Sequence, residues 1–301
     1  MRNCKVLFGG TLGDAFLDLC RLARVHEIYN VVFTAVRASA FEYRYFDKPI
    51  SELFSLTPYV NFLGASIESV DEQVYLNYII NGVPDLSKSF DIVSCTNDNM
   101  KKLFPRYSSP QCFPNITTPT VSCENKYCII QVQGGKYKKV EAVEGKTAVH
   151  GDLRGFLERG VATMCRYLNN LGYFVYLMGV STPVHRASYY DGLEDSFDVK
   201  NLMDNTNLVE AMGYIKNAEF FIGFDGFLSF FAPSQRVPTL LLSHLPCNPR
   251  FEIVGDNKDG CLTWKDYVEF VRPLPFPYYS LDVKEEIFDR TFTKFANRMG
   301  I

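Results

Sequence analysis

Short apolar runs that lead to glycine and are followed by helical patterns recur along this chain, and this alternation constrains its fold more than any other feature. Residues 5–8 form an apolar run before a pair of glycines, and a stripe of apolar residues with helical spacing follows over residues 15–23. Segments 127–132 and 173–178 are further apolar runs that lead to glycine. Alternating strands and helices predict a parallel sheet with helices on both faces, so we expect an α/β fold.

The second half of the chain carries the clearest pattern. A helix is predicted over residues 151–171, with Gly172 placed to end it. Asn205 or Thr206 is expected to cap the start of a further helix. The apolar segment 219–224 then reads as a strand, so strands and helices continue to alternate.

A proline-rich segment from residue 104 to residue 122 separates the two halves. It holds four prolines and no periodic pattern, which predicts an interdomain linker. A chain of 301 residues suits two domains, because a domain typically takes about 100–200 residues. We expect one domain over residues 1–115 and another over residues 123–280. The amphipathic segment 282–299 is expected to be a helix, and its packing back on the first domain stays open.

Composition narrows the kind of protein. The net charge of -3 lacks the strong positive balance of a general nucleic-acid-binding domain. The nine cysteines include no pair with C-x-x-C spacing, and their places in predicted strands and helices indicate reduced, buried thiols. The first residues lack the apolar core of a signal peptide, and no apolar run approaches the roughly 20 residues of a membrane span. We therefore expect a cytoplasmic protein, for which peripheral membrane contact stays open.

The glycine-rich turn after the first predicted strand is a candidate binding site. In open parallel sheets, ligands bind beyond the carboxyl ends of strands, and glycines let the backbone approach them. The turn runs Gly9-Gly-Thr-Leu-Gly-Asp14, and the helix start that follows offers N–H groups to a phosphate. Asp14 has two interpretations: a charge that caps the helix start, or a general base that takes a proton from a hydroxyl.

A second candidate turn follows the strand that is predicted to end at Phe224. The pair Asp225-Gly226 is a common turn sequence, and its place at the carboxyl end of a strand makes it a candidate ligand site. The basic run Lys136-Tyr-Lys-Lys139 follows another strand and two glycines. Most charge runs are solvated surfaces, yet a lysine at a strand end can neutralise a diphosphate as a compact point charge.

Other catalytic patterns do not occur in the sequence. The four histidines are scattered, and there is no G-x-S-x-G elbow, Walker P-loop or G-x-G-x-x-G motif. There is also no Asp-x-Asp pair, so a metal-dependent sugar-nucleotide site has no obvious ligands. We therefore expect neither a metal nor a cofactor.

Three segments resemble the heptosyltransferase-like glycosyltransferases of family 9. Gly9–Asp18 resembles the family's opening strand, G-x-L-G-D turn and helix. Asn201–Glu210 with Asn217–Gly223 resembles the stretch N-L-x-G-x-T-x-L-x-E … A-x-x-x-I-G. Phe224–Ala232 with Arg236–Thr239 resembles D-T-G-x-x-H-x-A-A … G-V-P-T. The resemblance implies a GT-B fold, in which two Rossmann-like domains face each other across a cleft.

The resemblance also implies roles for individual residues. Asp14 corresponds to the family's proposed catalytic base. The residues implied to bind the donor phosphates are Gly10, Thr11, Gly13, Lys136, Lys139, Asp225, Gly226, Phe227 and Ser229. The residues implied to lie near the nucleotide base are Gly179, Met203, Thr206 and Asn207. The first domain would then be the acceptor side, and the second would bind the nucleotide sugar.

The chain departs from the family pattern at several of these positions. Gly226 stands where the family has threonine, Phe227 where it has glycine, and Phe230 where it has histidine. Ser181-Thr-Pro183 replaces the acidic residue that is usual soon after the strand ending at Gly179. Because a phosphate-contacting side chain is lost, we expect the ligand to be held more by backbone amides and lysine.

The resemblance implies a glycosyltransferase of glycan biosynthesis that moves a sugar from a nucleotide-diphosphate donor to an acceptor hydroxyl, with inversion and without a metal. The acceptor would be a glycan or another hydroxyl compound, and a modified base of viral DNA stays open as a nucleic-acid acceptor. A DNA acceptor predicts a basic surface and salt-sensitive binding. Two further alternatives are a non-catalytic protein that binds sugar nucleotides and a related epimerase or donor hydrolase.

Overall fold

Two compact units make up the chain. The computed structural model describes residues 2–9, 11–38, 47–65, 90–93, 95, 97–107, 116, 118–119, 121, 123, 125–134, 138–139, 149–150, 154–181, 186–224, 226–242, 268–271 and 282–301. Among the described residues, the first unit runs from residue 2 to residue 116, and the second from residue 118 to residue 301. The division falls within the proline-rich segment 104–122.

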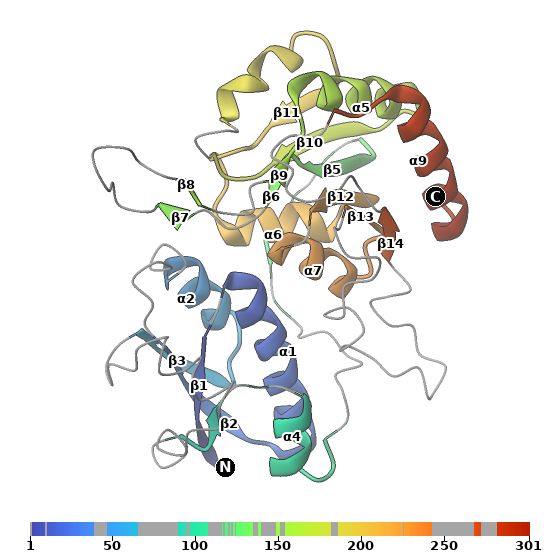
Figure 1. The fold of residues 1–301 in the computed structure, drawn as a ribbon. Coiled ribbons are helices and arrows are strands. Elements are labelled where there is room, and N and C mark those ends of the chain that lie inside the picture. The colour runs from blue at the N-terminus through green and yellow to red at the C-terminus, as the bar shows by residue number, and fades with distance from the viewer. Residues whose placement is uncertain are drawn as a thin grey trace. The chain divides into compact units, whose positions relative to one another are not determined.

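The first unit is built on a parallel sheet of four described strands in the order β3-β2-β1-β4 (Figure 1). The strands are β1 (Asn3–Phe8), β2 (Val32–Arg37), β3 (Val60–Ala65) and β4 (Ile92–Val93). The helices are α1 (Leu12–Tyr29), α2 (Asp47–Ser55) and α4 (Asn97–Leu103). Strand β1 lies between β2 and β4, so the strand that leads into the first glycine-rich turn is central in the sheet.

The core of the first unit lies on both faces of β1. Val6, Leu7 and Phe8 are consecutive residues that point alternately to opposite faces, and all three are buried. On one face, the ring of Phe8 stacks on Phe54 of α2 at 5.0 Å between ring centres. A continuous apolar run is what a strand with two covered faces requires, as the sequence predicted.

The second unit holds a larger parallel sheet. Six described strands lie in the order β11-β10-β5-β12-β13-β14. They are β5 (Tyr127–Gln131), β10 (Phe174–Met178), β11 (Val199–Asn201), β12 (Phe220–Phe224), β13 (Thr239–Leu242) and β14 (Val268–Val271). Counted along the chain, this is the order 3-2-1-4-5-6 of the Rossmann fold. The direction of strand order reverses between β5 and β12.

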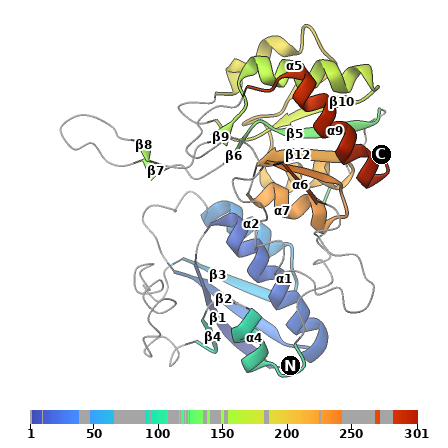
Figure 2. The ribbon, with the colours of Figure 1, turned by 45° about the vertical axis from the view of Figure 1, so that its right-hand side comes forward.

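Helices cover both faces of this sheet, as Figures 1 and 2 show. They are α5 (Glu158–Asn170), α6 (Leu208–Lys216), α7 (Phe227–Ser234) and α9 (Glu285–Met299). One face packs against α5 and α9, with Cys128 and Leu177 in the shared core. On the other face, Tyr176 of β10 lies 4.9 Å from Tyr214 of α6, measured between ring centres. The predicted α/β fold with helices on both faces of a parallel sheet is confirmed.

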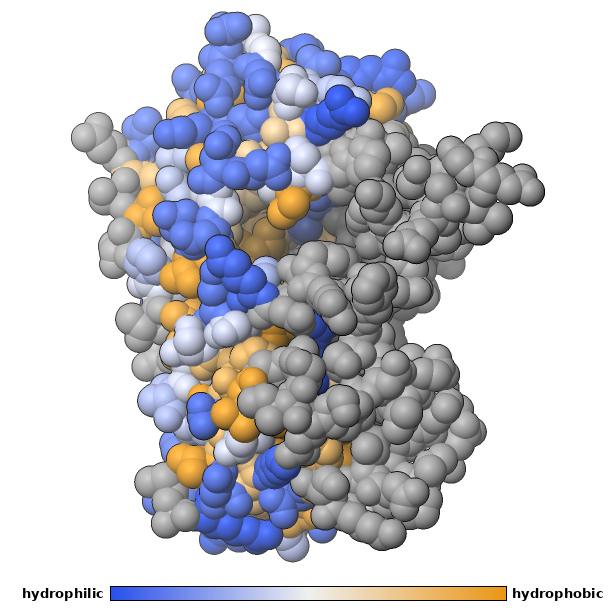
Figure 3. Space-filling view, turned by 90° about the vertical axis from the view of Figure 1, so that its left-hand side faces the viewer, coloured by the Kyte–Doolittle hydropathy of each residue, from blue (hydrophilic) through white to orange (hydrophobic). Residues whose placement is uncertain are grey.

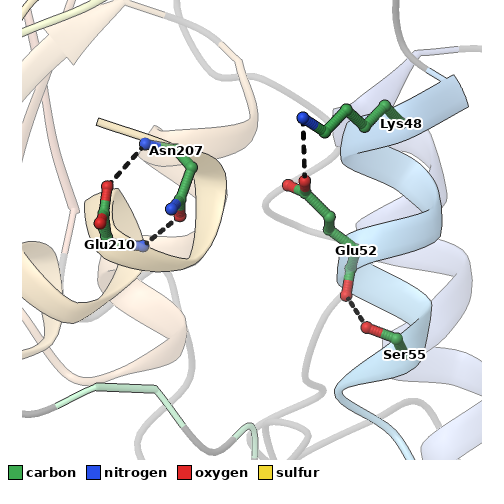
Figure 4. Close-up of polar contacts among 5 residues, drawn as sticks. All are labelled: Lys48, Glu52, Ser55, Asn207 and Glu210. Carbon is green, nitrogen blue, oxygen red and sulfur yellow. Dashed lines mark hydrogen bonds and ion pairs between the residues drawn. The ribbon is translucent and has the colours of Figure 1, made fainter. Parts of the chain in front are cut away.

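Two helix starts differ from the sequence-based prediction. Helix α5 begins at Glu158 rather than near residue 151, because the backbone of β9 (Arg154–Gly155) pairs with β6 (Gln133–Gly134). The predicted end is confirmed: Gly172 follows the helix with a left-handed φ of 84°. Helix α6 is capped by Asn207 rather than by Asn205 or Thr206. Asn207 Oδ1 accepts a hydrogen bond from the Glu210 N–H at 2.9 Å, and Glu210 Oε2 accepts one from the Asn207 N–H at 2.9 Å (Figure 4).

The C-terminal helix α9 packs on the second unit. Its apolar face carries Phe288, Phe292 and Phe295, which are buried in the core of the second unit. The rings of Phe292 and Phe220 of β12 lie 5.1 Å apart. Burial of this aromatic stripe against the sheet of the second unit stabilises α9 at that position.

A buried carboxylate joins α9 to β14. Glu269 is 5% exposed, and its Oε1 lies 2.6 Å from Lys294 Nζ, while its Oε2 accepts a hydrogen bond from Arg298. Burial by itself raises the pKa of Glu269, but the hydrogen bonds from Lys294 and Arg298 outweigh burial, so the pKa is lowered. The ionised carboxylate therefore stabilises the docking of α9.

Hydrophilic residues predominate over the described surface of the second unit on the face drawn in Figure 3, where this unit lies at the top. Large exposed apolar side chains among the described residues include Val180, Leu171 and Ile287. Among the described residues, no helix is long and apolar enough to span a membrane.

The Glu269 contacts predict a pH-dependent stability. Glu269→Gln is expected to lower the free energy of unfolding at pH 7 by about 1–3 kcal/mol, because an amide interacts weakly with two cations. A lowered pKa contributes stability above the unfolded pKa, and this contribution is lost as pH falls through the folded pKa. Urea unfolding of both proteins from pH 7 down to pH 3 should therefore show their difference shrinking.

Glu27→Gln is the matched control. The Glu27 side chain is 55% exposed and pairs with Arg24 within α1, so its loss is expected to change the free energy of unfolding by less than about 0.5 kcal/mol. A Glu269→Gln difference that stays constant over this pH range would contradict the assignment.

Candidate functional site

The reversal of strand order in the second unit marks a candidate ligand site. In open parallel sheets, ligands bind outside the carboxyl ends of the strands at the point where the strand order reverses. Here that point lies between β5, which ends at Gln131, and β12, which ends at Phe224. Helix α7 begins at Phe227, directly after β12, so its N-terminus belongs to this point of the sheet.

The first turn of α7 offers backbone rather than polar side chains. Ser229 is fully buried, and its hydroxyl accepts a hydrogen bond from the Gly226 N–H at 3.0 Å and donates one to the Gly226 carbonyl at 2.8 Å. Phe227 and Phe230 are also buried. Because the first N–H groups of a helix have no acceptor within the helix, and the helix dipole is positive at this end, an anion can bind here through the backbone. Both of these hydrogen bonds join the Ser229 hydroxyl to the backbone at the start of α7.

The predicted lysine site and the turn residue Asp225 lie largely outside the described residues. Asp225 and Lys136 are not among the residues that the structure describes. The backbone of Lys139 lies in β7 (Lys138–Lys139), which pairs antiparallel with β8 (Val149–His150). The role of either lysine at a diphosphate stays a prediction.

The residues predicted near the nucleotide base divide into two groups. Gly179 and Met203 lie together, since a Cβ atom on Gly179 would be 3.6 Å from Met203 Cε and 3.2 Å from Gln133 Cγ. Gly179 also has a φ of 152°, so its backbone and its surroundings both favour glycine. Thr206 and Asn207 serve the start of α6 instead: Thr206 Oγ1 donates to the Leu202 carbonyl at 3.5 Å, and Asn207 is the helix cap.

Gln131, at the end of β5, was not predicted from the sequence as a site residue. It is 8% exposed, and its Oε1 has no hydrogen-bond partner among the described residues. The same oxygen would lie 2.7 Å from a Cβ atom on Gly223, so glycine in β12 makes room for this amide. A polar residue at the end of the otherwise apolar run Tyr127–Ile130 was the available signal.

In the first unit, Asp14 caps the start of α1. Its Oδ2 accepts hydrogen bonds from the Thr11 N–H and from the Thr11 hydroxyl, both at 2.9 Å. The capping interpretation of Asp14 is thus realised, and these bonds hold a partly exposed carboxylate in one place at the turn. Gly13 is buried in the same first helical turn, and Gly10 lies outside the described residues.

A second carboxylate lies one helical turn further along α1. Asp18 Oδ1 lies 2.8 Å from Arg21 Nη1, and both side chains are buried. Burial raises the pKa of Asp18 to about 6; the Arg21 cation opposes this rise, and the nearby Asp14 charge adds to it. This side of α1 therefore combines an accessible carboxylate with a buried ion pair.

Five of the six described cysteines are buried in the core, and Cys123 is half-buried. Burial raises the pKa of Cys20, Cys95, Cys128 and Cys165, so these thiols stay protonated and unreactive at neutral pH. In the part of the chain that the structure describes, no three His, Cys, Asp or Glu residues gather in a way that could hold a metal ion.

Solved structures of bacterial heptosyltransferases share this fold. E. coli heptosyltransferase WaaC with ADP is similar with a TM-score of 0.59 at 12% sequence identity, over 98% of this chain and 100% of that one. E. coli ADP-heptose lps heptosyltransferase II gives 0.60 at 12% identity, over 100% of both chains. WaaC with ADP-2-deoxy-2-fluoro heptose gives 0.57 at 12% identity, over 98% of this chain and 99% of that one.

The likeness is one of fold. No protein-family model matches the sequence, and no curated protein sequence matches it. At 12% identity, the similarity over whole chains establishes a heptosyltransferase-like α/β fold. The heptosyltransferase-like α/β fold expected from the three motif segments is thereby confirmed, and the cleft between two facing domains stays a prediction.

The hydroxyl of Ser229 gives a testable prediction on the start of α7. Ser229→Ala is expected to lower the free energy of unfolding by about 1–3 kcal/mol, because the partly buried Gly226 N–H loses its acceptor. Urea unfolding measures the change. Thr163→Ala, which removes a more exposed hydroxyl bonded to the Arg159 carbonyl, is the control and should change stability by less than about 0.5 kcal/mol. Equal stability of Ser229→Ala and wild type would contradict the role of this hydroxyl.

Proposed function

We propose that the chain is a glycosyltransferase that moves a sugar from a nucleoside-diphosphate donor to an acceptor hydroxyl. The observation that carries the proposal is the N-terminus of α7 at the reversal of strand order, in a fold similar over its whole length to heptosyltransferases. Two of the similar structures are complexes with ADP and with ADP-2-deoxy-2-fluoro heptose. A nucleoside diphosphate has the negative charge that a helix N-terminus favours.

On the donor side, the second unit would hold the diphosphate through the first-turn amides of α7. Gly226 and Phe227 bring no polar side chain, so backbone dipoles would supply the binding. Lys136 or Lys139 would add a point charge. Fixed dipoles and a lysine stabilise the charge that develops on the leaving diphosphate without reorganising during the reaction.

On the acceptor side, Asp14 would be the general base. Its carboxylate would take the proton of the acceptor hydroxyl, and the oxygen would attack the anomeric carbon of the donor sugar. The bond from that carbon to the diphosphate oxygen breaks, and the nucleoside diphosphate leaves with the electron pair. A single displacement of this kind inverts the configuration at the anomeric carbon. The proposal assigns no step to a metal ion.

A second candidate is a protein that binds a sugar nucleotide without transferring the sugar. The observation that favours it is the first turn of α7, where buried Phe227 and Phe230 occupy positions that carry glycine and histidine in the resembled motif. Both candidates predict nucleotide-sugar binding, and only transfer separates them.

Binding and transfer can be tested in that order. A thermal-shift panel of nucleotide sugars is expected to identify the donor, because a ligand that binds only the folded state raises the unfolding temperature. With that donor and a set of glycan acceptors, Asp14→Asn is expected to lower the release of nucleoside diphosphate by about 100-fold or more while donor binding is retained. The asparagine can still accept the hydrogen bonds from Thr11, so the helix start should persist.

Glu27→Gln removes a carboxylate from the same helix and is expected to keep full activity. Full activity of a folded Asp14→Asn protein would rule out Asp14 as the base. Donor binding by wild type without transfer to any acceptor would favour the binding protein, and a panel without any stabilising nucleotide sugar would contradict both candidates.

A further inference from the structure

Asp204 adopts a backbone conformation that is unfavourable for most residues other than glycine. It lies between β11 and α6, is exposed, and has a φ of 59°, in the left-handed region that favours glycine. The motif that this segment resembles has glycine at this position. Aspartate adopts this conformation at a cost in free energy that glycine avoids. We therefore expect the carboxylate to make an interaction that glycine cannot make.

The carboxylate of Asp204 is held at the carboxyl end of another strand. Its Oδ1 accepts a hydrogen bond from the Ser181 N–H at 2.8 Å, and its own N–H donates to the Gly179 carbonyl at 3.3 Å. Gly179 directly follows β10. The loop after β10 is thus joined to the loop after β11, and the acidic group of the second loop stands beside the first.

Strand β10 is the second strand of a sheet with the order 3-2-1-4-5-6. In nucleotide-binding folds of this order, an acidic side chain near the end of the second strand accepts hydrogen bonds from the ribose hydroxyls. Val180 and Ser181 follow Gly179 here, so this loop supplies no acidic residue of its own among the described positions. Asp204 brings a carboxylate to that place from the neighbouring loop.

The surroundings suit a nucleoside. Val180, between the two residues that bond Asp204, is 68% exposed, so the loop segment that holds the carboxylate also carries an accessible apolar residue. A nucleoside combines an apolar base with a pair of hydroxyl donors, and pockets for such ligands pair apolar contacts with a few polar groups that fix orientation.

We infer that Asp204 binds the ribose hydroxyls of the nucleotide donor, an inference that rests on the proposed function. The hydrogen bond from Ser181 orients the carboxylate, and the carboxylate accepts from the ribose. Asp204 is thereby a specificity residue that selects ribonucleotides from analogues lacking these hydroxyls. It binds the donor and takes no part in the proton transfer assigned to Asp14.

The test compares ribonucleotides with analogues that lack both hydroxyls. Binding of ADP, UDP, GDP and CDP is measured by calorimetry, each beside its 2′,3′-dideoxy counterpart. Wild type is expected to bind at least one ribonucleotide about tenfold or more tighter than its dideoxy form, in line with hydrogen bonds to a charged group. Asp204→Gly is expected to reduce this ratio to about one, and Asp204→Asn to an intermediate value.

These variants separate binding from folding. Glycine accepts the left-handed backbone without strain, so Asp204→Gly is expected to fold, and asparagine can still accept the bond from Ser181. Asp195→Asn removes an exposed carboxylate elsewhere on the same unit and should keep the wild-type ratio.

The outcomes are distinct for the two proposals. If wild type binds none of these nucleotides, the proposed function and the role of Asp204 both fail. If a nucleotide binds and Asp204→Gly keeps the wild-type preference for ribose, the role of Asp204 fails while the proposed function stands.

Discussion

In the second unit, the six described strands of the main sheet run parallel, so all of them end at the same edge of this sheet. The apolar faces of β5, β10 and β12 are closed by helices, so the polar groups that these elements carry collect at their ends. The reversal of strand order between β5 and β12 then leaves the start of α7 at the centre of this edge. The candidate site follows from this one constraint of strand direction and order.

Helix starts and ligand sites both use side-chain oxygens and backbone N–H groups. For this reason, some residues that the sequence predicted as ligand contacts bond a helix start in the structure. An oxygen near a helix start can accept the helix N–H groups or contact a ligand, and sequence does not distinguish these uses. Ser229 and Asn207 bond their own helix starts. Asp14 bonds Thr11 and is still partly exposed, so capping places a carboxylate that can also serve chemistry.

Polar groups at this edge can come from more than one loop. The first turn of α7 brings Phe227, which is buried, whereas the loop before α6 brings Asp204 to the end of β10. A polar group can have the same role at this edge whichever neighbouring loop supplies it, because the role depends on the position of the group in space. The spacing of motif residues along the chain does not reveal which loop supplies the group.

The sequence by itself determined the α/β class, the strands within 127–132 and 219–224, and the end of α5 just before Gly172, because apolar periodicity and a left-handed glycine are local properties. It placed the start of α5 too early, because the pairing of Arg154–Gly155 with Gln133–Gly134 is a contact between distant segments. Only the tertiary structure decided that α9 packs on the second unit, that Gln131 occupies the space beside Gly223, and that Asp204 stands at Ser181. Each of these depends on which elements lie side by side, and strand order in a sheet is settled by packing across the whole unit rather than by any one segment.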